Sequence, residues 1–365
     1  MAHNTDIPRE RLAALRSAAQ LLHRPRGYEH PADLARAIGG VQAQDAAAGR
    51  LAFRARNSRV TAADVDRART EERSLLRTWA MRQTMHLLPA DDAPWLLPLF
   101  EPAISDNSRR RLTQLGVEPA ARERALREVR RGLEAEGPLT RDELAERLTR
   151  RRLSFDTGQR MHLFRLAVTS GMACLGPDRG HRTCLVLAED WLGERPPHDR
   201  DAALSELARR YVRAFGPATE VDFAGWTGLG LRDVRAALAS VASELKEVRV
   251  GGDPAWTLRR AARVPRGPAV RLLPAWDTYL MGHRDRDFIA GSEHWPRIMR
   301  GGGILAPAIL VDGAAAGTWK LSRGGRQPKV QIEPFADLDP PTLAAIEAEA
   351  RDIGRFEGTE VGFAA

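Results

Sequence analysis

Hydrophobic positions recur every three to four residues over most of the chain, and this spacing is typical of amphipathic helices. In the first part of the chain the pattern predicts helices over residues 9–22 and 31–39, a third that begins after Gly40 and runs to about Arg56, and a fourth over 61–70. Residues 75–89 instead carry β-branched and aromatic side chains near their centre. They are expected to form a pair of strands.

One arrangement of helices and a hairpin occurs twice in the middle of the chain. In the first copy, a helix over 120–135 precedes a second helix whose start, Thr140 with Glu143, has the spacing of a capping box. A third helix and a strand–turn–strand segment follow. The second copy lies 79 residues later, with Pro217 in the place of Pro138. Helix–turn–helix followed by a hairpin is typical of a winged helix, and the N-terminal helices with residues 75–89 fit the same plan more loosely.

The pattern changes towards the C-terminus. Residues 268–335 are predicted to be rich in strands, with Asp312-Gly313 as a hairpin turn, and the acidic segment 339–355 is predicted to be helical. The expected fold is therefore mainly α with β, an α+β protein of tandem winged-helix repeats. Its expected domains are a first winged helix over 1–115, a second over 116–198, a third over 199–265 and a C-terminal β-rich segment over 266–365.

The charge of the chain gives information about its partner. Lysine and arginine number 56 and the acids 48, and only three of the bases are lysines. Residues 331–365 hold eight acids and two arginines, so the rest of the chain carries a net charge of +14. A GC-rich genome is one explanation for the preference for arginine. A basic body with an acidic end nevertheless indicates a polyanionic partner.

Composition argues against several classes of protein. Charged residues make up 28% and hydrophobic residues 43% of the chain, as in globular proteins, and no apolar stretch is long enough to span a membrane. The N-terminus lacks an apolar export signal, so a cytoplasmic protein without a membrane partner is expected. Cys174 and Cys184 flank a predicted turn, where a reducing compartment disfavours a disulfide and no second pair of zinc ligands follows.

The usual catalytic motifs are also missing. The sequence contains no phosphate loop, Gly-x-Ser-x-Gly elbow or His-Glu-x-x-His pair, so no cofactor and no metal is expected. Gln42-Ala43-Gln44 is of interest because it follows two glycines at the predicted start of a helix. A glutamine amide is no general base near neutral pH, but it can orient a water molecule and stabilise an adjacent positive charge. Alternatively, the two glutamines cap the helix or pack against the strand pair.

Four blocks of sequence, in order along nearly the whole chain, carry a resemblance to a known family. They are Gly40-Val41-Gln42-Ala43-Gln44-Asp45, Arg77-Thr78-Trp79-Ala80-Met81-Arg82-Gln83-Thr84-Met85-His86-Leu87, Leu273-Pro274-Ala275-Trp276-Asp277-Thr278-Tyr279-Leu280, and Val311-Asp312-Gly313 with Gly317-Thr318-Trp319. In these blocks the chain resembles the AlkZ-like branch of the AlkZ/YcaQ winged-helix DNA glycosylases.

The resemblance implies both a shape and an activity. It implies a C-shaped protein of tandem winged helices with a C-terminal β-barrel-like part. The implied activity is excision of bulky guanines alkylated at N7 by natural genotoxins, crosslinks included, in self-resistance or repair. Gln42 and Gln44 match the Gln-x-Gln signature of this branch, whose two residues act at the scissile bond. Asp45 lies one position later and does not match the aspartate of the other branch.

Further expectations concern the reaction and the contacts with double-stranded DNA. Loss of a purine that already carries positive charge needs little acid assistance, so a metal-independent hydrolysis is expected. None of the three lysines is near these blocks in the sequence, which favours a monofunctional glycosylase, and a monomer is expected. The chain has no heptad seam of the kind that a dimeric regulator uses. The residues expected to contact DNA are Arg77, Trp79, Arg82, Thr84, His86, Asp277, Tyr279, Arg284 and Arg286.

Alternatives remain at this stage. If residues 77–86 alternate as a strand, one face carries Arg77, Trp79, Met81, Gln83 and Met85 and the other carries Thr78, Arg82, Thr84 and His86. One face then meets DNA or the adduct, or Trp79 and Met85 belong to the core instead. The whole chain could be a winged-helix regulator without enzymatic activity, or a repair enzyme for small methyl lesions.

Overall fold

The computed structural model describes residues 6–24, 27–193, 199–260, 264–265, 268–323 and 327–364. The chain divides into two compact units, one made of residues 1–65 together with 204–365 and the other of residues 66–203. The predicted first winged helix is split between these units, so the four predicted domain boundaries stay a prediction. Each unit is described by itself.

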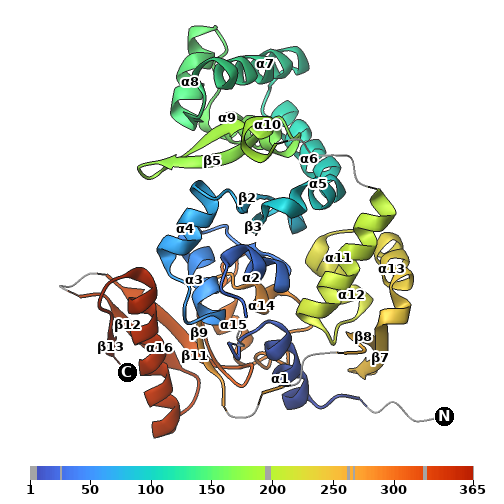
Figure 1. Cartoon of the computed structure of the whole chain (residues 1–365), viewed down its shortest axis with the longest axis vertical. Helices are drawn as coiled ribbons and strands as arrows, with labels where there is room; N and C mark the ends of the chain where they lie inside the picture. Colours follow the sequence, from blue (N-terminus) through green and yellow to red (C-terminus); the bar gives the residue numbers. More distant parts are fainter. Residues whose placement is uncertain are drawn as a thin grey trace. The chain divides into compact units, whose positions relative to one another are not determined.

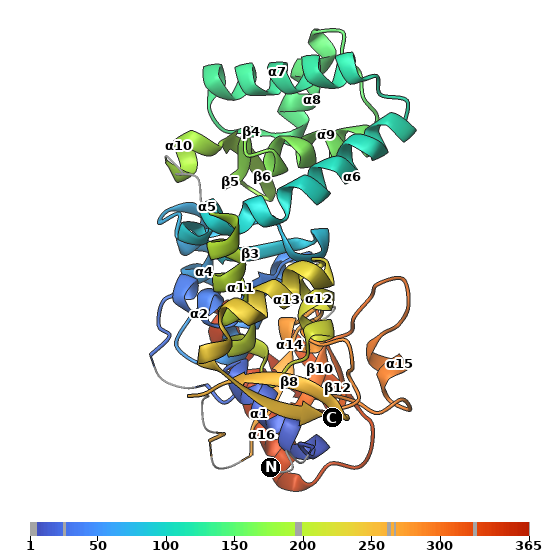
Figure 2. The ribbon, with the colours of Figure 1, turned by 90° about the vertical axis from the view of Figure 1, so that its right-hand side faces the viewer.

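The unit of residues 66–203 contains a winged helix (Figure 2). Its strands β4, β6 and β5 form an antiparallel sheet in that order, as predicted for a helix–turn–helix with a hairpin. Thr140 caps α8 with Glu143 in the predicted capping box. The elements of this unit are β2 Leu75–Trp79, β3 Met85–Pro89, α5 Ala93–Leu96, α6 Glu101–Gln114, α7 Pro119–Glu136, β4 Leu139–Thr140, α8 Arg141–Arg150, α9 Thr157–Thr169, β5 Ala173–Arg179, β6 Arg182–Leu187 and α10 Ala188–Leu192.

The other unit contains the second predicted copy of this arrangement. Thr219 caps α12 with Asp222 in a capping box, at the position equivalent to Thr140. Ala218 pairs with Trp256 of the hairpin, as Leu139 pairs with Leu185 in the first copy. The predicted repeat is therefore confirmed in its secondary structure. Its elements are α11 Arg200–Phe215, α12 Glu220–Thr227, α13 Leu231–Ser240, β7 Leu245–Val250 and β8 Asp253–Leu258. The first residues of α11 belong to the unit of residues 66–203.

The N-terminal helices and a curled five-stranded sheet complete this unit (Figure 1). The strand order is β13-β12-β11-β10-β9, antiparallel except for β12 with β13, and the sheet forms a half-barrel. Asp312 and Gly313 both have positive φ (52° and 87°) in the predicted two-residue turn. The elements are α1 Arg9–Ala19, α2 Pro31–Ala37, β1 Val41–Gln42, α3 Ala46–Arg56, β9 Val270–Leu273, α14 Thr278–Met281, α15 Trp295–Ile298, β10 Ala308–Val311, β11 Ala314–Ser322, β12 Lys329–Pro334, α16 Pro340–Glu357 and β13 Gly362–Ala364, while α4 Ala62–Thr70 crosses the boundary between the units.

The secondary structure differs from the prediction at residues 278–281. The fold is α+β, as predicted, but residues 278–281 form a helical turn and not part of a strand, because the Asp277 carboxylate accepts the backbone N–H of Tyr279 at 2.9 Å. The acidic C-terminal segment is helical, as predicted. No helix within the described ranges combines the length and the apolar character that a membrane crossing requires.

The acidic helix α16 neutralises several arginines of its own unit. It packs on β9 and α3. Glu349 is buried and pairs with Arg54 at 2.9 Å, Arg24 at 2.9 Å and Arg271 at 3.6 Å. Part of the charge asymmetry in the sequence therefore serves the interior of the protein and not a partner.

Candidate functional site

The two candidate catalytic glutamines lie on an extended segment that ends just before α3. Gly39 and Gly40 have φ values of +79° and +95°, which favour glycine, and they lead into β1. Helix α3 begins only at Ala46, because the Asp45 carboxylate accepts the backbone N–H of Ala48 at 2.8 Å as the N-cap. The expectation that Gln42 and Gln44 start the helix is therefore wrong, and Asp45 has a capping role.

The segment packs closely against α3. Ala43 is fully buried, and a Cβ atom on Gly49 would lie 3.0 Å from the Cβ of Ala43, so glycine allows this approach. Gln42 is 7% exposed, whereas Gln44 is exposed. Gln44 is thus the more accessible of the two amides to a bound substrate.

Thr278 holds this segment in place, which the sequence did not reveal. Its hydroxyl accepts the backbone N–H of Gln42 at 3.3 Å and donates to the carbonyl of Gly40 at 3.2 Å. Both bonds are buried. A side chain of the 273–280 block therefore fixes the backbone of the block that carries the two glutamines.

The neighbours of Thr278 also make internal contacts. Asp277 forms two hydrogen bonds of 2.8 Å with the guanidinium of Arg56, and both side chains are fully buried. The hydroxyl of Tyr279 donates to the carbonyl of Gly313 at 2.7 Å, and burial raises the pKa of this phenol. The prediction that Asp277 and Tyr279 contact DNA is wrong, because neither side chain reaches the surface.

Arg284 and Arg286, also predicted to contact DNA, differ in their exposure. Arg284 is exposed, and its backbone N–H is bound by the Asp222 carboxylate at 2.8 Å. Arg286 is half-buried, with its guanidinium 5.2 Å from the centre of the Trp295 ring, and burial lowers its pKa. Contact of these two arginines with DNA stays a prediction, and Arg284 is the more accessible.

Strands β2 and β3 have the predicted faces. Trp79 pairs with Met85 and Arg77 with Leu87, while Thr78 pairs with His86, and paired residues share a face. The alternation does not continue through the connection, because residues 81–83 form a 3₁₀ turn in which Arg82 has φ +52°.

One predicted DNA contact on these strands is wrong and others stay open. His86 is 2% exposed, and its Nδ1 donates to the carbonyl of Thr84 at 3.0 Å. Burial, aided by the charge of Arg82, lowers the pKa of His86 to about 3, so the ring is neutral and enclosed. Arg77, Arg82 and Thr84 are half-buried, and their contact with DNA stays a prediction.

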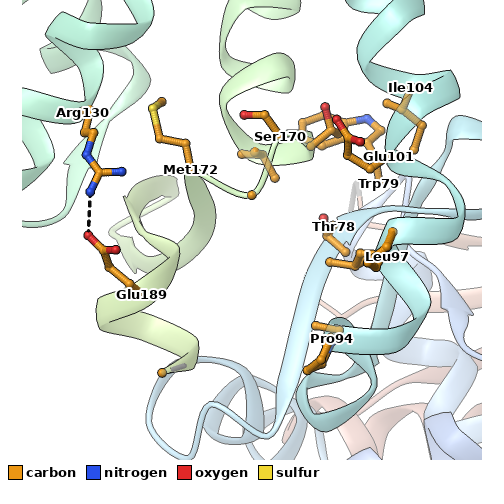
Figure 3. A pocket seen from close by; sticks show the side chains of 16 residues that line it. Thr78, Trp79, Pro94, Leu97, Glu101, Ile104, Arg130, Ser170, Met172 and Glu189 are labelled. Atoms are coloured by element: carbon orange, nitrogen blue, oxygen red, sulfur yellow. Dashed lines mark hydrogen bonds and ion pairs between the residues drawn. The ribbon is translucent and has the colours of Figure 1, made fainter. Parts of the chain in front are cut away.

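Trp79 lines a cavity of about 1010 Å³ within residues 66–203 (Figure 3). Its ring also packs against the core that contains Met85, as the alternative interpretation of the sequence proposed. In Figure 3, Thr78 and Leu97 lie on one side of this cavity and Met172 lies on the other. Trp79 thus has one part in the core and one at a cavity wall.

A second cavity adjoins the glutamine segment. It measures about 390 Å³ and is lined by Asp45, next to Gln44, and by Lys320 of β11. Lys320 is far from Gln42 in the sequence, so the structure brings an amine closer to the candidate site than the sequence indicated. No group of three or more His, Cys, Asp or Glu side chains suited to a metal ion occurs in the described part of the chain.

Winged-helix repeats are typical of proteins that bind DNA. A sequence model of the AlkZ-like DNA glycosylases matches residues 35–356, and the chain belongs to this family. It is 29% identical over 352 residues to the interstrand DNA cross-link repair glycosylase of Streptomyces sahachiroi, covering 92% of each chain. The solved structure of the Streptomyces sahachiroi DNA glycosylase AlkZ is similar with a TM-score of 0.78 and 26% identity, over 99% of this chain and 100% of that one.

Proposed function

We propose that this chain hydrolyses the N-glycosidic bond of guanines alkylated at N7 in double-stranded DNA, including those joined in crosslinks. The family supports an activity on DNA. The name of the Streptomyces relative supports crosslinks as substrates. The corresponding role is self-resistance or repair against a natural genotoxin.

The observation that carries the proposal is the geometry of Gln42 and Gln44. Thr278 fixes the backbone at Gln42, and the Asp45 cap fixes the chain directly after Gln44. Two amide dipoles on a fixed backbone need little reorganisation when charge develops, and such pre-organised groups are the main source of electrostatic catalysis. Gln44 is exposed, so its amide can reach a substrate.

The reaction balances without an acid or a metal. N7 alkylation gives the purine a positive charge, and the sugar becomes oxocarbenium-like as the C1′–N9 bond breaks. The electron pair of that bond neutralises the departing base. A water molecule, oriented by the two amides, attacks C1′ and releases its proton to solvent. The product is an abasic strand, and the chain acts as a monomeric, monofunctional glycosylase.

The test is release of the base. A duplex with one N7-methylguanine or one N7-benzylguanine is incubated with excess protein and excess chelator, and free bases are separated by chromatography. We expect release from both duplexes and none from unmodified DNA. Tight binding to DNA without release of any base would instead favour a winged-helix regulator. Release that stops in chelator would contradict the metal-independent step.

A further inference from the structure

The cavity beside Asp45 has an apolar interior formed from distant segments. Ala48 and Leu51 of α3 line it together with Trp276 and with Trp319 of β11. Its volume of about 390 Å³ is in the range of sites for small organic molecules, which begins at about 300 Å³. The glutamine segment does not need such a space for its own packing, since Ala43 already fills the contact with α3.

The two tryptophans offer carbon surface to this cavity. The indole N–H of Trp276 donates to the carbonyl of Gly303 at 2.8 Å, and that of Trp319 donates to the carbonyl of Leu273 at 2.7 Å. Both polar edges are therefore satisfied by the protein itself. Trp276 also has φ +53°, an unfavourable backbone conformation for a bulky residue, and such strain is concentrated at functional sites.

The polar lining of the cavity is mainly basic. Arg300, Lys320 and Arg323 are exposed members of its wall, whereas its two acids, Asp45 and Glu333, each accept a hydrogen bond within the protein. Asp45 accepts the N–H of Ala48, and Glu333 accepts the hydroxyl of Thr318 at 3.4 Å. An apolar interior with basic groups around it suits an uncharged organic group on a DNA base, with the basic side chains available to the phosphates of the strand.

We propose that this cavity holds the apolar substituent that an alkylating agent leaves on the target guanine. The inference rests on the proposed function, in which the scissile bond lies at Gln42 and Gln44. Asp45, which lines the cavity, directly follows Gln44, so the cavity adjoins the segment that carries the two glutamines. Ala48, Leu51 and Trp276 then determine how large a substituent the site accepts, and they are specificity-determining residues.

The experiment fills the cavity and compares substituents of different size. Ala48→Met places a longer, helix-compatible side chain on the cavity wall, and Ala47→Met does the same from the adjacent wall position. Ala46→Met is the matched control, because Ala46 is exposed on the first turn of the same helix and does not line the cavity. The substrates are duplexes with one guanine that carries methyl, benzyl or naphthylmethyl at N7. Thermal unfolding establishes that each variant is folded.

We expect Ala48→Met to lower kcat/KM at least tenfold for the largest substituent that the wild-type chain removes and less than twofold for the smallest. Ala46→Met should leave both values unchanged. An equal fall for all substituents, no fall for any, or a wild-type chain that removes only the methylated base overturns the cavity assignment and leaves the proposed function in place. A wild-type chain that releases none of these bases overturns the proposed function, and this inference with it.

Discussion

The hydroxyl of Thr278 accepts a hydrogen bond from the backbone N–H of Gln42 and joins two segments that are 236 residues apart in the sequence. Since the same hydroxyl donates to Gly40, a valine at this position leaves one N–H and one C=O without their partner. We expect Thr278→Val to lower kcat about 10- to 100-fold, as a small displacement of a positioned group does, with little change in KM. Thr278→Ser keeps the hydroxyl and should restore the rate. Wild-type turnover of Thr278→Val, or a loss confined to KM, would contradict this positioning role.

Removal of either amide should stop catalysis and leave DNA binding nearly intact. Gln44→Ala and Gln42→Ala each lose one orienting group, which should raise the barrier by about 2–4 kcal/mol. Single-turnover base release gives the rate and a gel-shift titration gives the affinity. Gln114→Ala is the matched control, because Gln114 is an exposed amide of α6 in the other unit. If both site variants turn over at the wild-type rate, the glutamines are structural.

Substitution of Asp277 should lower the stability of the protein, whereas substitution of Arg284 should lower its affinity for DNA. Asp277→Ala leaves the guanidinium of Arg56 buried without its carboxylate, which should lower the free energy of unfolding by about 3–5 kcal/mol. Arg284→Gln removes an exposed charge and should weaken DNA binding without a change in melting temperature. Thermal unfolding and salt titrations of DNA affinity measure the two effects. These assignments would be reversed if a folded Asp277→Ala protein bound DNA more weakly, or if Arg284→Gln bound DNA as tightly as the wild type.

Borohydride trapping tests whether the product is an intact abasic strand. A lyase step needs an amine of the protein that attacks C1′, and Lys320 lines the cavity beside Asp45. We expect no covalent adduct in the presence of borohydride, and strand cleavage only after alkali. A trapped adduct that disappears in Lys320→Gln, while Lys329→Gln still forms it, would show that Lys320 is a nucleophile and that water is not.

Acid should destabilise the unit that contains His86. The folded pKa of His86 is about 3 and the unfolded value about 6.5, so the unfolded chain binds a proton that the folded chain does not. The stability is therefore complete above about pH 6.5 and falls as the pH drops towards 3, by about 2 kcal/mol between pH 7 and pH 5. Denaturant unfolding at both values measures this. His86→Gln should reduce the dependence of the free energy of unfolding on pH. The contribution of His283, whose pKa burial also lowers, should remain. An unchanged dependence on pH would mean that His86 titrates equally in both states.

Local signals in the sequence predicted much of the secondary structure. The capping box at Thr140 and the turn at Asp312-Gly313 depend on residues within three positions of each other, so their spacing alone identifies them. The α+β class and the repeated winged helix follow from the same local spacing.

Local spacing could not predict which charged side chains are exposed and which are paired in the interior. The sequence predicts Asp277 at a DNA contact together with Tyr279, Arg284 and Arg286, but charged side chains can also be buried when they are paired. The partner of Asp277, Arg56, is 221 residues away, and no local pattern identifies such a pair. Thr278 was equally impossible to find from local spacing, because it is 236 residues from Gln42. Lys320 is also far from Gln44 in the sequence, but it lines the cavity that Asp45 lines. The spacing of the apolar residues predicts a helix that begins at the Gln-x-Gln segment, whereas the Asp45 cap delays its start until Ala46.

The hydrogen bond between Thr278 and Gln42 also has a consequence for the order in which the protein is made. A ribosome delivers the N-terminus first, at about 5–20 residues per second. Gln42 and Gln44 leave the ribosome early, but Thr278, and Glu349 beneath α3, follow more than two hundred residues later. The nascent chain therefore carries both amides for most of its synthesis without the contacts that fix them. The contacts that hold this segment and α3 are therefore complete only when the last helix has been translated and has packed against α3.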